Sequence, residues 1–120
     1  AGIRPKLFVV EYNSTFGPDN RLVIEYSENF DYRKAHSSEL YYGASISAWK
    51  KLFASFGYIF ITVETNGANA FFVDPSGFDD QFVKQIKGID FKENFYHLRK
   101  FKFGWQKQFE LIKNMNFLKT

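Results

Sequence analysis

An apolar run near the start of the chain constrains the fold most. Residues 7–12 read Leu7-Phe8-Val9-Val10-Glu11-Tyr12, which is almost continuously apolar. Such a run is typical of a strand that is covered on both faces in a parallel sheet. Pro5 stands just before it, where a missing amide donor does least harm, and the turn-forming residues 13–20 follow it. The sequence therefore predicts a buried strand over residues 7–12.

An amphipathic helix is predicted over residues 46–56. Five apolar side chains recur there at spacings of three and four, which places them on one helix face: Ile46, Trp49, Leu52, Phe53 and Phe56. Gly43 or Ser45 can begin this helix, and Gly57 stands where a left-handed residue commonly ends one. We expect this helix to be the crossover between the first strand and the next.

Two further strands are predicted at residues 58–64 and 69–74, which are rich in β-branched and aromatic residues. Between them lies Thr65-Asn66-Gly67-Ala68. An Asn-Gly pair flanked by strands is the strongest short-range signal for a hairpin. The later strand is therefore expected to return antiparallel to the earlier one.

The remaining segments give weaker signals. Residues 21–26 alternate and suggest a short strand, whereas residues 27–42 have no clear period and suggest a long loop. Pro75-Ser76-Gly77 breaks the sheet, and residues 78–86 and 104–115 suggest two short helices.

The predicted order is strand–helix–strand–hairpin–strand with a helical C-terminal tail, which is an α/β fold. A strand, a crossover helix and a second strand form a right-handed unit with a parallel pair of strands. The last strand must then run antiparallel. Three strands leave the edges of the sheet exposed, so self-association across an edge is a physical expectation.

Composition limits the available chemistry. The chain has 120 residues, enough for one domain at most, and it has no cysteine. That excludes a disulfide framework, a thiolate metal site and a cysteine nucleophile. His36 and His97 alone cannot form a zinc centre, and the scattered acidic residues lack ligand spacing, so no metal site is expected. No apolar stretch approaches the roughly 18–20 residues that span a bilayer, which favours a soluble, cytoplasmic protein.

Positive charge gathers late in the chain. The net charge is +3, yet residues 1–74 carry seven Lys or Arg against eight Asp or Glu, and residues 75–120 carry nine against five. Near residue 100, basic residues alternate with Phe101, Phe103 and Trp105. These rings could stack on nucleic-acid bases or lie on an anionic membrane. Equally, they could pack on the sheet while the lysines face water, which is the interpretation we favour.

Several ordered motifs resemble a known family. They are Arg4-Pro5-Lys6-Leu7-Phe8-Val9-Val10-Glu11-Tyr12-Asn13, Tyr41-Tyr42-Gly43-Ala44-Ser45, Gly57-Tyr58 and Asn66-Gly67-Ala68-Asn69-Ala70-Phe71-Phe72-Val73. Together they resemble the C-terminal half of class I methyltransferase-like proteins, and more narrowly the FkbM-type group found beside cell-surface polysaccharide genes. The resemblance covers residues 3–74 well and residues 75–120 loosely.

The resemblance implies a partial Rossmann-like, three-layer sandwich. The family's sheet has seven mostly parallel strands, and a hairpin inserts the last strand antiparallel. Residues 1–74 would be the closing half of that sheet, and residues 75–120 a helical, basic and aromatic tail. The chain enters its first strand at once and without an initiator Met, so residues 1–120 are expected to be a single domain or a domain fragment.

The resemblance also implies S-adenosylmethionine as the cofactor of the parent family. The glycine-rich loop and the acidic ribose-binding residue of that family have no counterpart here. Residues 43–45 do not replace the loop, because no strand immediately precedes them and the Gly-x-Gly spacing is absent. We therefore expect this chain alone to bind no cofactor, and its partner to be the missing N-terminal half or a second copy paired at the exposed edge.

Candidate site residues gather at one rim of the predicted sheet. In open α/β sheets, ligands bind beyond the carboxyl ends of the parallel strands. The candidates there are Glu11, Asn13, Tyr42, Ser45, Asn66 and Asn69. Glu11 could orient a hydroxyl acceptor or act as the catalytic base, and the alternative is that its carboxylate caps local backbone amides.

The other five candidates also have structural alternatives. Asn13 could contact substrate or form an Asx turn. Tyr42 and Ser45 could contact substrate or cap the helix, whose free amides favour an anion. Asn66 suits the hairpin turn, and Asn69 suits a structural hydrogen bond.

The two histidines have weaker functional signals. His36 lies in the long loop and could be a general base near neutral pH, although such residues are more often solvated at the surface. His97 lies in a basic helical stretch and is expected at the surface.

The sequence thus favours part of a methyltransferase-like domain that methylates an oxygen of a sugar or polysaccharide precursor, with no nucleic-acid partner. The alternative is a non-catalytic α/β binding module that uses its basic, aromatic tail for nucleic acid, an anionic membrane or a protein.

Overall fold

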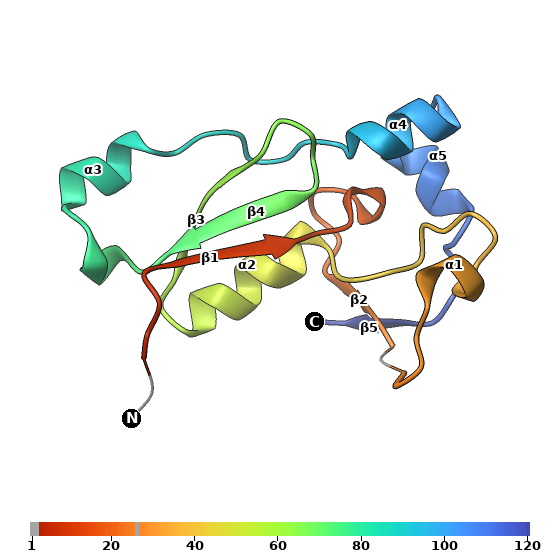
Figure 1. Ribbon diagram of the computed structural model, residues 1–120, viewed down its shortest axis with the longest axis horizontal. Coiled ribbons are helices and arrows are strands. Elements are labelled where there is room, and N and C mark those ends of the chain that lie inside the picture. Colours follow the sequence, from red (N-terminus) through yellow and green to blue (C-terminus); the bar gives the residue numbers. More distant parts are fainter. Residues whose placement is uncertain (1–2, 26) are drawn as a thin grey trace.

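Two antiparallel sheets and five α-helices make up the computed structural model, which describes residues 3–25 and 27–120 (Figure 1). Tyr26, the last residue of the strand predicted over 21–26, lies outside the described residues. The protein is mixed α/β and flat, with extents of 45 × 33 × 19 Å. No helix in the described ranges is both long enough and apolar enough to cross a bilayer.

The first sheet contains β1 (Leu7–Glu11), β3 (Ile59–Val63) and β4 (Asn69–Val73) in the order β1-β4-β3. Both outer strands pair antiparallel with β4, so β1 and β3 run in the same direction without touching as a pair. The predicted parallel pair is therefore wrong. The hairpin instead brings β4 back between the two strands, where its backbone pairs on both sides.

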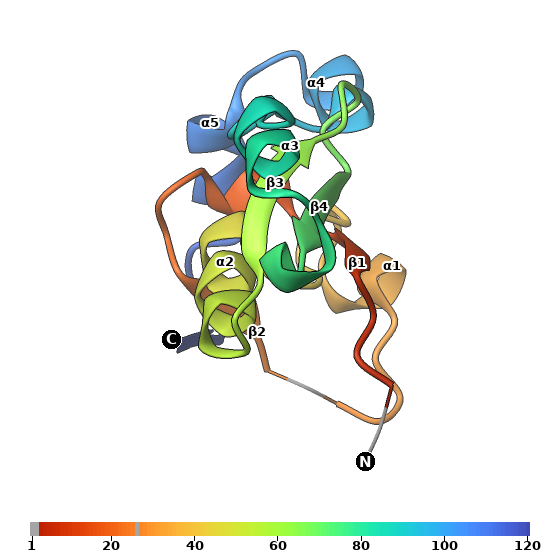
Figure 2. The same cartoon turned by 90° about the vertical axis from the view of Figure 1, so that its left-hand side faces the viewer.

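Helix α2 (Ile46–Ser55) covers one face of this sheet (Figure 2). Ser45 caps it, because its hydroxyl accepts a hydrogen bond from the amide of Ala48. Phe53 on the helix stacks on Phe72 of β4 with ring centroids 4.3 Å apart. The predicted helix and its cap are confirmed, and this contact lies in the main core.

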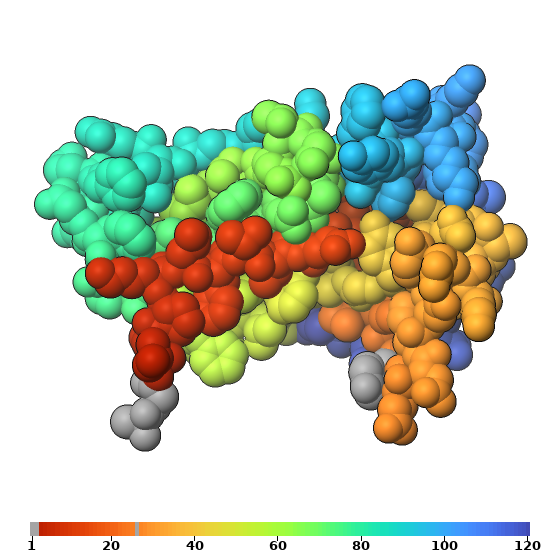
Figure 3. Space-filling view, in the orientation of Figure 1, coloured from red at the N-terminus to blue at the C-terminus, as the bar shows by residue number. Residues whose placement is uncertain are grey.

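Strand β1 is not covered on both faces, which corrects the prediction of a buried strand. Phe8 and Val10 pack toward α2, whereas Leu7 and Val9 are 50% and 49% exposed. The space-filling view shows the same strand, in red, uncovered along this face (Figure 3). The cause is position: β1 is an edge strand, and its alternate side chains point away from α2.

The predicted hairpin between β3 and β4 is confirmed. Gly67 adopts φ +70°, and a Cβ there would lie 2.1 Å from the carbonyl oxygen of Glu93. The carbonyl of Asn66 accepts a hydrogen bond of 2.9 Å from the amide of Phe95. The turn therefore docks against residues 93–95, where a helix of the C-terminal part begins.

The β3 edge of the first sheet is covered. The amide of Gly88 donates to the carbonyl of Ile61, and the amide of Val63 donates to the carbonyl of Ile89. A short extended segment at residues 88–89 thus satisfies backbone groups of β3. Among the described residues no comparable segment covers β1, so the sheet has one protected and one open edge.

A second, two-stranded sheet pairs β2 (Leu22–Ile24) with β5 (Phe117–Lys119). β2 falls within the predicted strand 21–26, whereas β5 was not predicted. A separate core cluster forms beside this sheet from Phe16, Leu22, Leu40, Tyr41 and Ile112.

The remaining helices are short: α1 (Tyr32–Ala35), α3 (Asp80–Gln85), α4 (Phe95–Phe101) and α5 (Trp105–Glu110), with 3-10 turns η1 (Ser14–Phe16) and η2 (Pro75–Gly77). The two predicted tail helices are present as α3 and α5, each shorter than expected. Helix α1 interrupts the predicted long loop. Asn94 caps α4 through its side-chain oxygen, and its amide donates to the Ser14 hydroxyl in the turn after β1.

Candidate functional site

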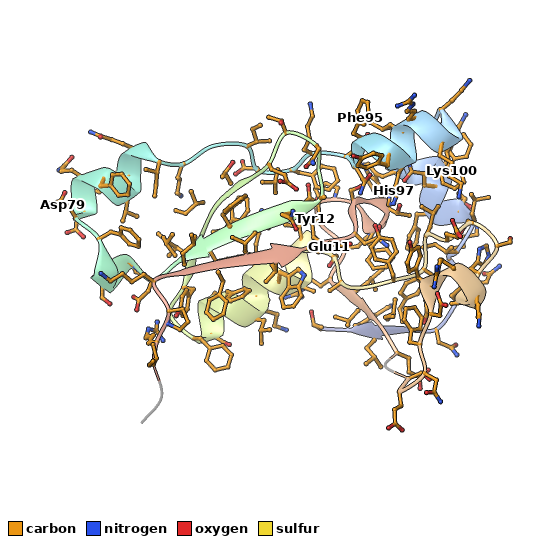
Figure 4. All side chains as sticks on the ribbon, in the orientation of Figure 1. Glu11, Tyr12, Asp79, Phe95, His97 and Lys100 are labelled. Atoms are coloured by element: carbon orange, nitrogen blue, oxygen red, sulfur yellow. The ribbon has the colours of Figure 1, made fainter. Side chains whose placement is uncertain are left out.

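A cavity of about 590 Å³ lies beside the carboxyl end of β1. Figure 4 shows Glu11 at the end of that strand and His97 on α4 nearby. The lining residues come from β1, the loop with α1, and α4: Glu11, Tyr32, Ser38, Glu39, Leu40, Tyr42, Tyr96, His97, Lys100 and Phe101. Two carboxylates, three tyrosines, a histidine and a lysine thus meet around one concave space.

A buried polar turn after β1 supports the cavity from behind its lining residues. Asn13 is fully buried, and its side-chain oxygen accepts a hydrogen bond from the amide of Thr15. Its side-chain amide donates to the carbonyls of Leu40 and Tyr42 at 2.7 and 3.0 Å. Asn13 is therefore an Asx-turn residue that holds the Tyr42 segment in place, and it does not line the cavity.

The other end of this turn binds α4. The Ser14 hydroxyl accepts a hydrogen bond of 2.8 Å from the amide of Asn94, the residue that caps the helix. Ser14 and Thr15 are both almost fully buried. Every buried side-chain nitrogen and oxygen in the described residues has a hydrogen-bond partner, so the polar turn is a satisfied structural junction.

A row of hydrogen bonds runs from the cavity into the protein. The Tyr42 hydroxyl lies 3.1 Å from Nε2 of His97, and Nδ1 of His97 lies 3.3 Å from the Thr15 hydroxyl. The Thr15 hydroxyl donates to Oε1 of Gln108 at 2.8 Å, and Nε2 of Gln108 donates to the carbonyl of Phe103. Gln108 is fully buried, so this row ends in the interior.

Burial keeps the two groups at the mouth of this row neutral near pH 7. Burial lowers the pKa of His97 to about 4, and the charge of Lys100 acts in the same direction. Burial also raises the pKa of Tyr42 above its usual range, with a further contribution from the charge of Glu11.

Glu11 is the free carboxylate of the site. It is exposed and its carboxylate makes no hydrogen bond or ion pair within residues 3–25 and 27–120. It lies opposite Asn69 across the β1–β4 ladder, and the Asn69 amide donates to Glu64 at 2.7 Å. By contrast, Glu39 across the cavity pairs with Lys100 at 3.2 Å. The structure thus brings Glu11, Tyr42 and Asn69 to the same region.

Ser45 and Asn66 do not join this region. Ser45 is fully buried, and its hydroxyl accepts hydrogen bonds from the amides of Leu22 and Ala48. Asn66 is exposed in the hairpin turn and bonds through its backbone carbonyl to Phe95. Both residues hold structural positions that the sequence analysis had named as alternatives.

The surface position predicted for His97 is wrong, because its ring is half-buried at the cavity wall. A signal for this position in the sequence was Asn94, which suits a helix N-cap. It places His97 in the first turn of α4, where the Asn94 side chain accepts a hydrogen bond from the His97 amide. His36 is also half-buried, and its Nδ1 accepts a hydrogen bond from the amide of Ser38. His36 is a local turn residue outside the cavity.

The cavity also contains residues that were not predicted. Tyr32, Tyr96, Glu39 and Lys100 reach it from the segment with α1 and from α4. No local pattern could indicate this meeting, because it depends on how two distant segments pack.

The aromatic residues of the basic tail pack inward in part. Phe101 contacts the second core cluster, and the Trp105 ring lies so close to Gly17 that a Cβ there would be 2.5 Å away. Phe103 is half-buried beside Phe101. The three rings thus pack inward as expected, but against the second core cluster, one another and Gly17, not on the first sheet.

A larger groove, of about 860 Å³, lies between α2 and β2. Its lining is mainly apolar and includes Ile24, Ala48, Trp49 and Leu52. Among the described residues of its lining there is no histidine or tyrosine, and Glu28 is the one carboxylate side chain, so we place the candidate site at the smaller cavity. Within the described ranges, no three His, Asp or Glu side chains come together to hold a metal ion.

Comparison with known proteins adds no assignment at this point. No protein-family model, curated protein or solved structure matches the chain. The methyltransferase resemblance therefore remains a prediction from the sequence motifs.

Proposed function

We propose that this chain supplies the acceptor-binding half of a methyltransferase-like domain that methylates an oxygen of a sugar or polysaccharide precursor. The observation that carries the proposal is the strand order β1-β4-β3, in which a hairpin inserts one antiparallel strand between two strands of equal direction. That order is what the resemblance implies for the closing part of a Rossmann-like sheet. The cavity lies beyond the carboxyl end of β1, where such sheets bind ligands.

The cavity has the groups that a sugar needs. Tyr32 and Tyr96 offer ring surfaces, and both are exposed enough to contact a ligand. Glu11 can accept a hydrogen bond from a sugar hydroxyl and then its proton, which makes that oxygen a better nucleophile. Holding the hydroxyl in one orientation would supply most of the rate effect.

In this proposal, S-adenosylmethionine binds outside this chain. The turn that follows β1 is a compact 3-10 turn whose Asn13, Ser14 and Thr15 side chains are consumed by internal hydrogen bonds. It offers no glycine-rich backbone to S-adenosylmethionine. The chain does not fit that cofactor by itself, and the methyl donor would be held by the missing N-terminal half.

The open edge of β1 is where that half would join. In the register with β4, the amides and carbonyls of Leu7 and Val9 point away from β4. These groups have no backbone partner among the described residues. A strand of the missing half, or β1 of a second copy, could pair there.

A cytoplasmic location is part of the same proposal.

Methyl transfer tests the proposal. The longer polypeptide that includes the residues encoded upstream of Ala1 is incubated with tritium-labelled S-adenosylmethionine and a panel of sugars. We expect label in a sugar, and a loss of at least about tenfold in rate for Glu11→Gln. Glu25→Gln, which changes an exposed carboxylate outside the cavity, is the matched control. No labelled sugar, or equal rates for both variants, would contradict the proposal.

The alternative function, a binding module that uses its basic and aromatic tail, has less support. Phe101, Phe103 and Trp105 are half-buried, so they offer little ring surface for stacking. If this alternative were correct, single-stranded RNA or anionic vesicles would bind tightly and with a steep salt dependence. We expect weak binding of both.

A further inference from the structure

In the row of hydrogen bonds behind Tyr42, each donor and each acceptor can be assigned. The assignment begins at the buried end of the row. The carbonyl of Phe103 can only accept, so the group of Gln108 that faces it is the amide nitrogen. The side-chain oxygen of Gln108 then faces Thr15, 2.8 Å away. Because an amide oxygen can only accept, the Thr15 hydroxyl must donate its single proton to Gln108.

The direction continues through His97. Thr15 has no second proton, so its oxygen must accept from Nδ1 of His97. The neutral ring therefore carries its proton on Nδ1 and has an unprotonated Nε2. Nε2 in turn accepts from the Tyr42 hydroxyl, 3.1 Å away. All four hydrogen bonds point the same way, from the cavity to the interior.

This direction decides what Tyr42 offers to a ligand. Its proton is committed to His97, so only oxygen lone pairs remain for the cavity. The Glu11 carboxylate is also an acceptor, and Lys100, the one Lys or Arg among the described residues of the lining, is paired with Glu39. At Tyr42 and Glu11 the cavity thus presents acceptors and negative charge to a ligand.

We infer that the cavity selects neutral or aminated sugars over phosphorylated ones, with His97 acting as a positioning residue that holds Tyr42 as a hydrogen-bond acceptor. The inference rests on the proposed function in taking the ligand to be a sugar. Hydroxyl and ammonium groups donate to Tyr42 and Glu11, and an ammonium group also gains from the nearby tyrosine rings. A phosphate group would face the unpaired carboxylate of Glu11 and would be repelled.

The tautomer of His97 is the first test and needs no ligand. Nitrogen-15 NMR of the 120-residue chain near pH 7 distinguishes a proton on Nδ1 from a proton on Nε2. We expect the Nδ1 form. Predominance of the Nε2 form would overturn the inference, because Tyr42 would then be free to donate its proton to a ligand.

Ligand selectivity is the second test. Glucose, glucosamine and glucose 6-phosphate are titrated into the chain while the NMR signals of Tyr42 and His97 are followed. We expect glucosamine and glucose to shift these signals and glucose 6-phosphate to bind at least about tenfold more weakly. Equal or tighter binding of the phosphate, or no shift with any of the three sugars, would overturn the inference.

Variants separate positioning from simple structural support. Thr15→Val removes the acceptor for Nδ1 of His97, and Thr15→Ser keeps it as the matched control. We expect Val to move the proton to Nε2 and to reduce the preference for glucosamine over glucose 6-phosphate, with the repulsion by Glu11 remaining. Ser should keep the proton on Nδ1 and the full preference. Unchanged selectivity in a folded Val variant would overturn the positioning role. If the Val variant does not fold, His97→Gln is compared with His97→Leu, because Gln keeps an acceptor for the Tyr42 hydroxyl and Leu does not. Equal sugar selectivity in these two variants would overturn the positioning role of His97.

These binding tests use no methyl donor, so they fail independently of the proposed function. Sugar selectivity without methyl transfer in the longer polypeptide would reject the methyltransferase and keep the site. Methyl transfer to a phosphorylated sugar would keep the methyltransferase and reject the inferred sugar selectivity.

Discussion

At the residue scale, His97 gives the protein a measurable pH signature. Its pKa is about 4 in the folded chain and about 6.5 in an unfolded one, because folding buries the ring. Below pH 6.5 the unfolded chain binds a proton that the folded chain rejects, so stability falls toward pH 4. We expect about 2 kcal/mol of loss from this residue, which allows for solvent screening of the partly exposed ring.

The measurement is urea unfolding of the wild type and of His97→Gln from pH 7 to pH 4. Other groups titrate in the same range, among them Asp74, whose pKa the Arg4 guanidinium lowers. The difference between the two proteins isolates His97. The difference in unfolding free energy between the wild type and His97→Gln should shrink as the pH falls. Parallel plots of unfolding free energy against pH would show that the ring is not buried in its neutral form.

Individual site residues were predictable only where their position follows from a single element. Glu11 ends a strand, so its place at the rim followed from the apolar run before it. His97 was placed at the surface, because its burial depends on contacts of α4 with the Ser14 turn and the Asn66 turn. No local pattern around His97 contains those partners.

At the element scale, the hairpin turn positions α4 and therefore the cavity. We expect Gly67→Ala to cost about 3 kcal/mol of unfolding free energy, because its Cβ would collide with the Glu93 backbone and φ is +70°. Gly43→Ala is the matched control: φ is +66°, but a Cβ there would meet nothing within 4 Å. It should cost about 1 kcal/mol. Denaturant unfolding measures both, and equal costs would mean that the turn does not dock as described.

Strand β1 makes a second prediction at this scale. The amide of Val10 donates to β4, whereas the amide of Val9 points to the open edge. Val9→Pro should therefore keep the circular-dichroism spectrum of the fold and abolish any association through the edge, and Val10→Pro should unfold the chain. Sedimentation velocity and circular dichroism test the pair. Unfolding of both variants, or of neither, would contradict the assigned edge.

Elements defined by local sequence were predicted well. The spacing of Ile46 and Phe53, the Ser45 cap and the Asn66-Gly67 turn gave α2 and the hairpin with near-correct bounds. Strand β5 was not predicted, because its strand partner among the described residues is β2, far away in the sequence. The prediction that β1 is buried on both faces was wrong for a similar reason. An apolar run is compatible with packing on one face or on both, and distant parts of the chain decide which.

At the scale of the whole molecule, the two edges of the first sheet differ. Residues 88–89 cover β3, and the apolar side chains of Leu7 and Val9 stand exposed along β1. The radius of gyration is 15.4 Å, against about 14 Å for a compact chain of this length. The open edge of β1 is thus a place where a further strand could pair with this sheet.

The measurement that tests this account most directly is calorimetric titration with S-adenosylmethionine. It compares the 120-residue chain with the longer polypeptide that includes the residues encoded upstream of Ala1. We predict no binding by the chain alone and binding in the micromolar range by the longer polypeptide. Micromolar binding by the chain alone, or no binding by the longer polypeptide, would contradict the claim that this chain is the acceptor-binding half of a methyltransferase-like domain.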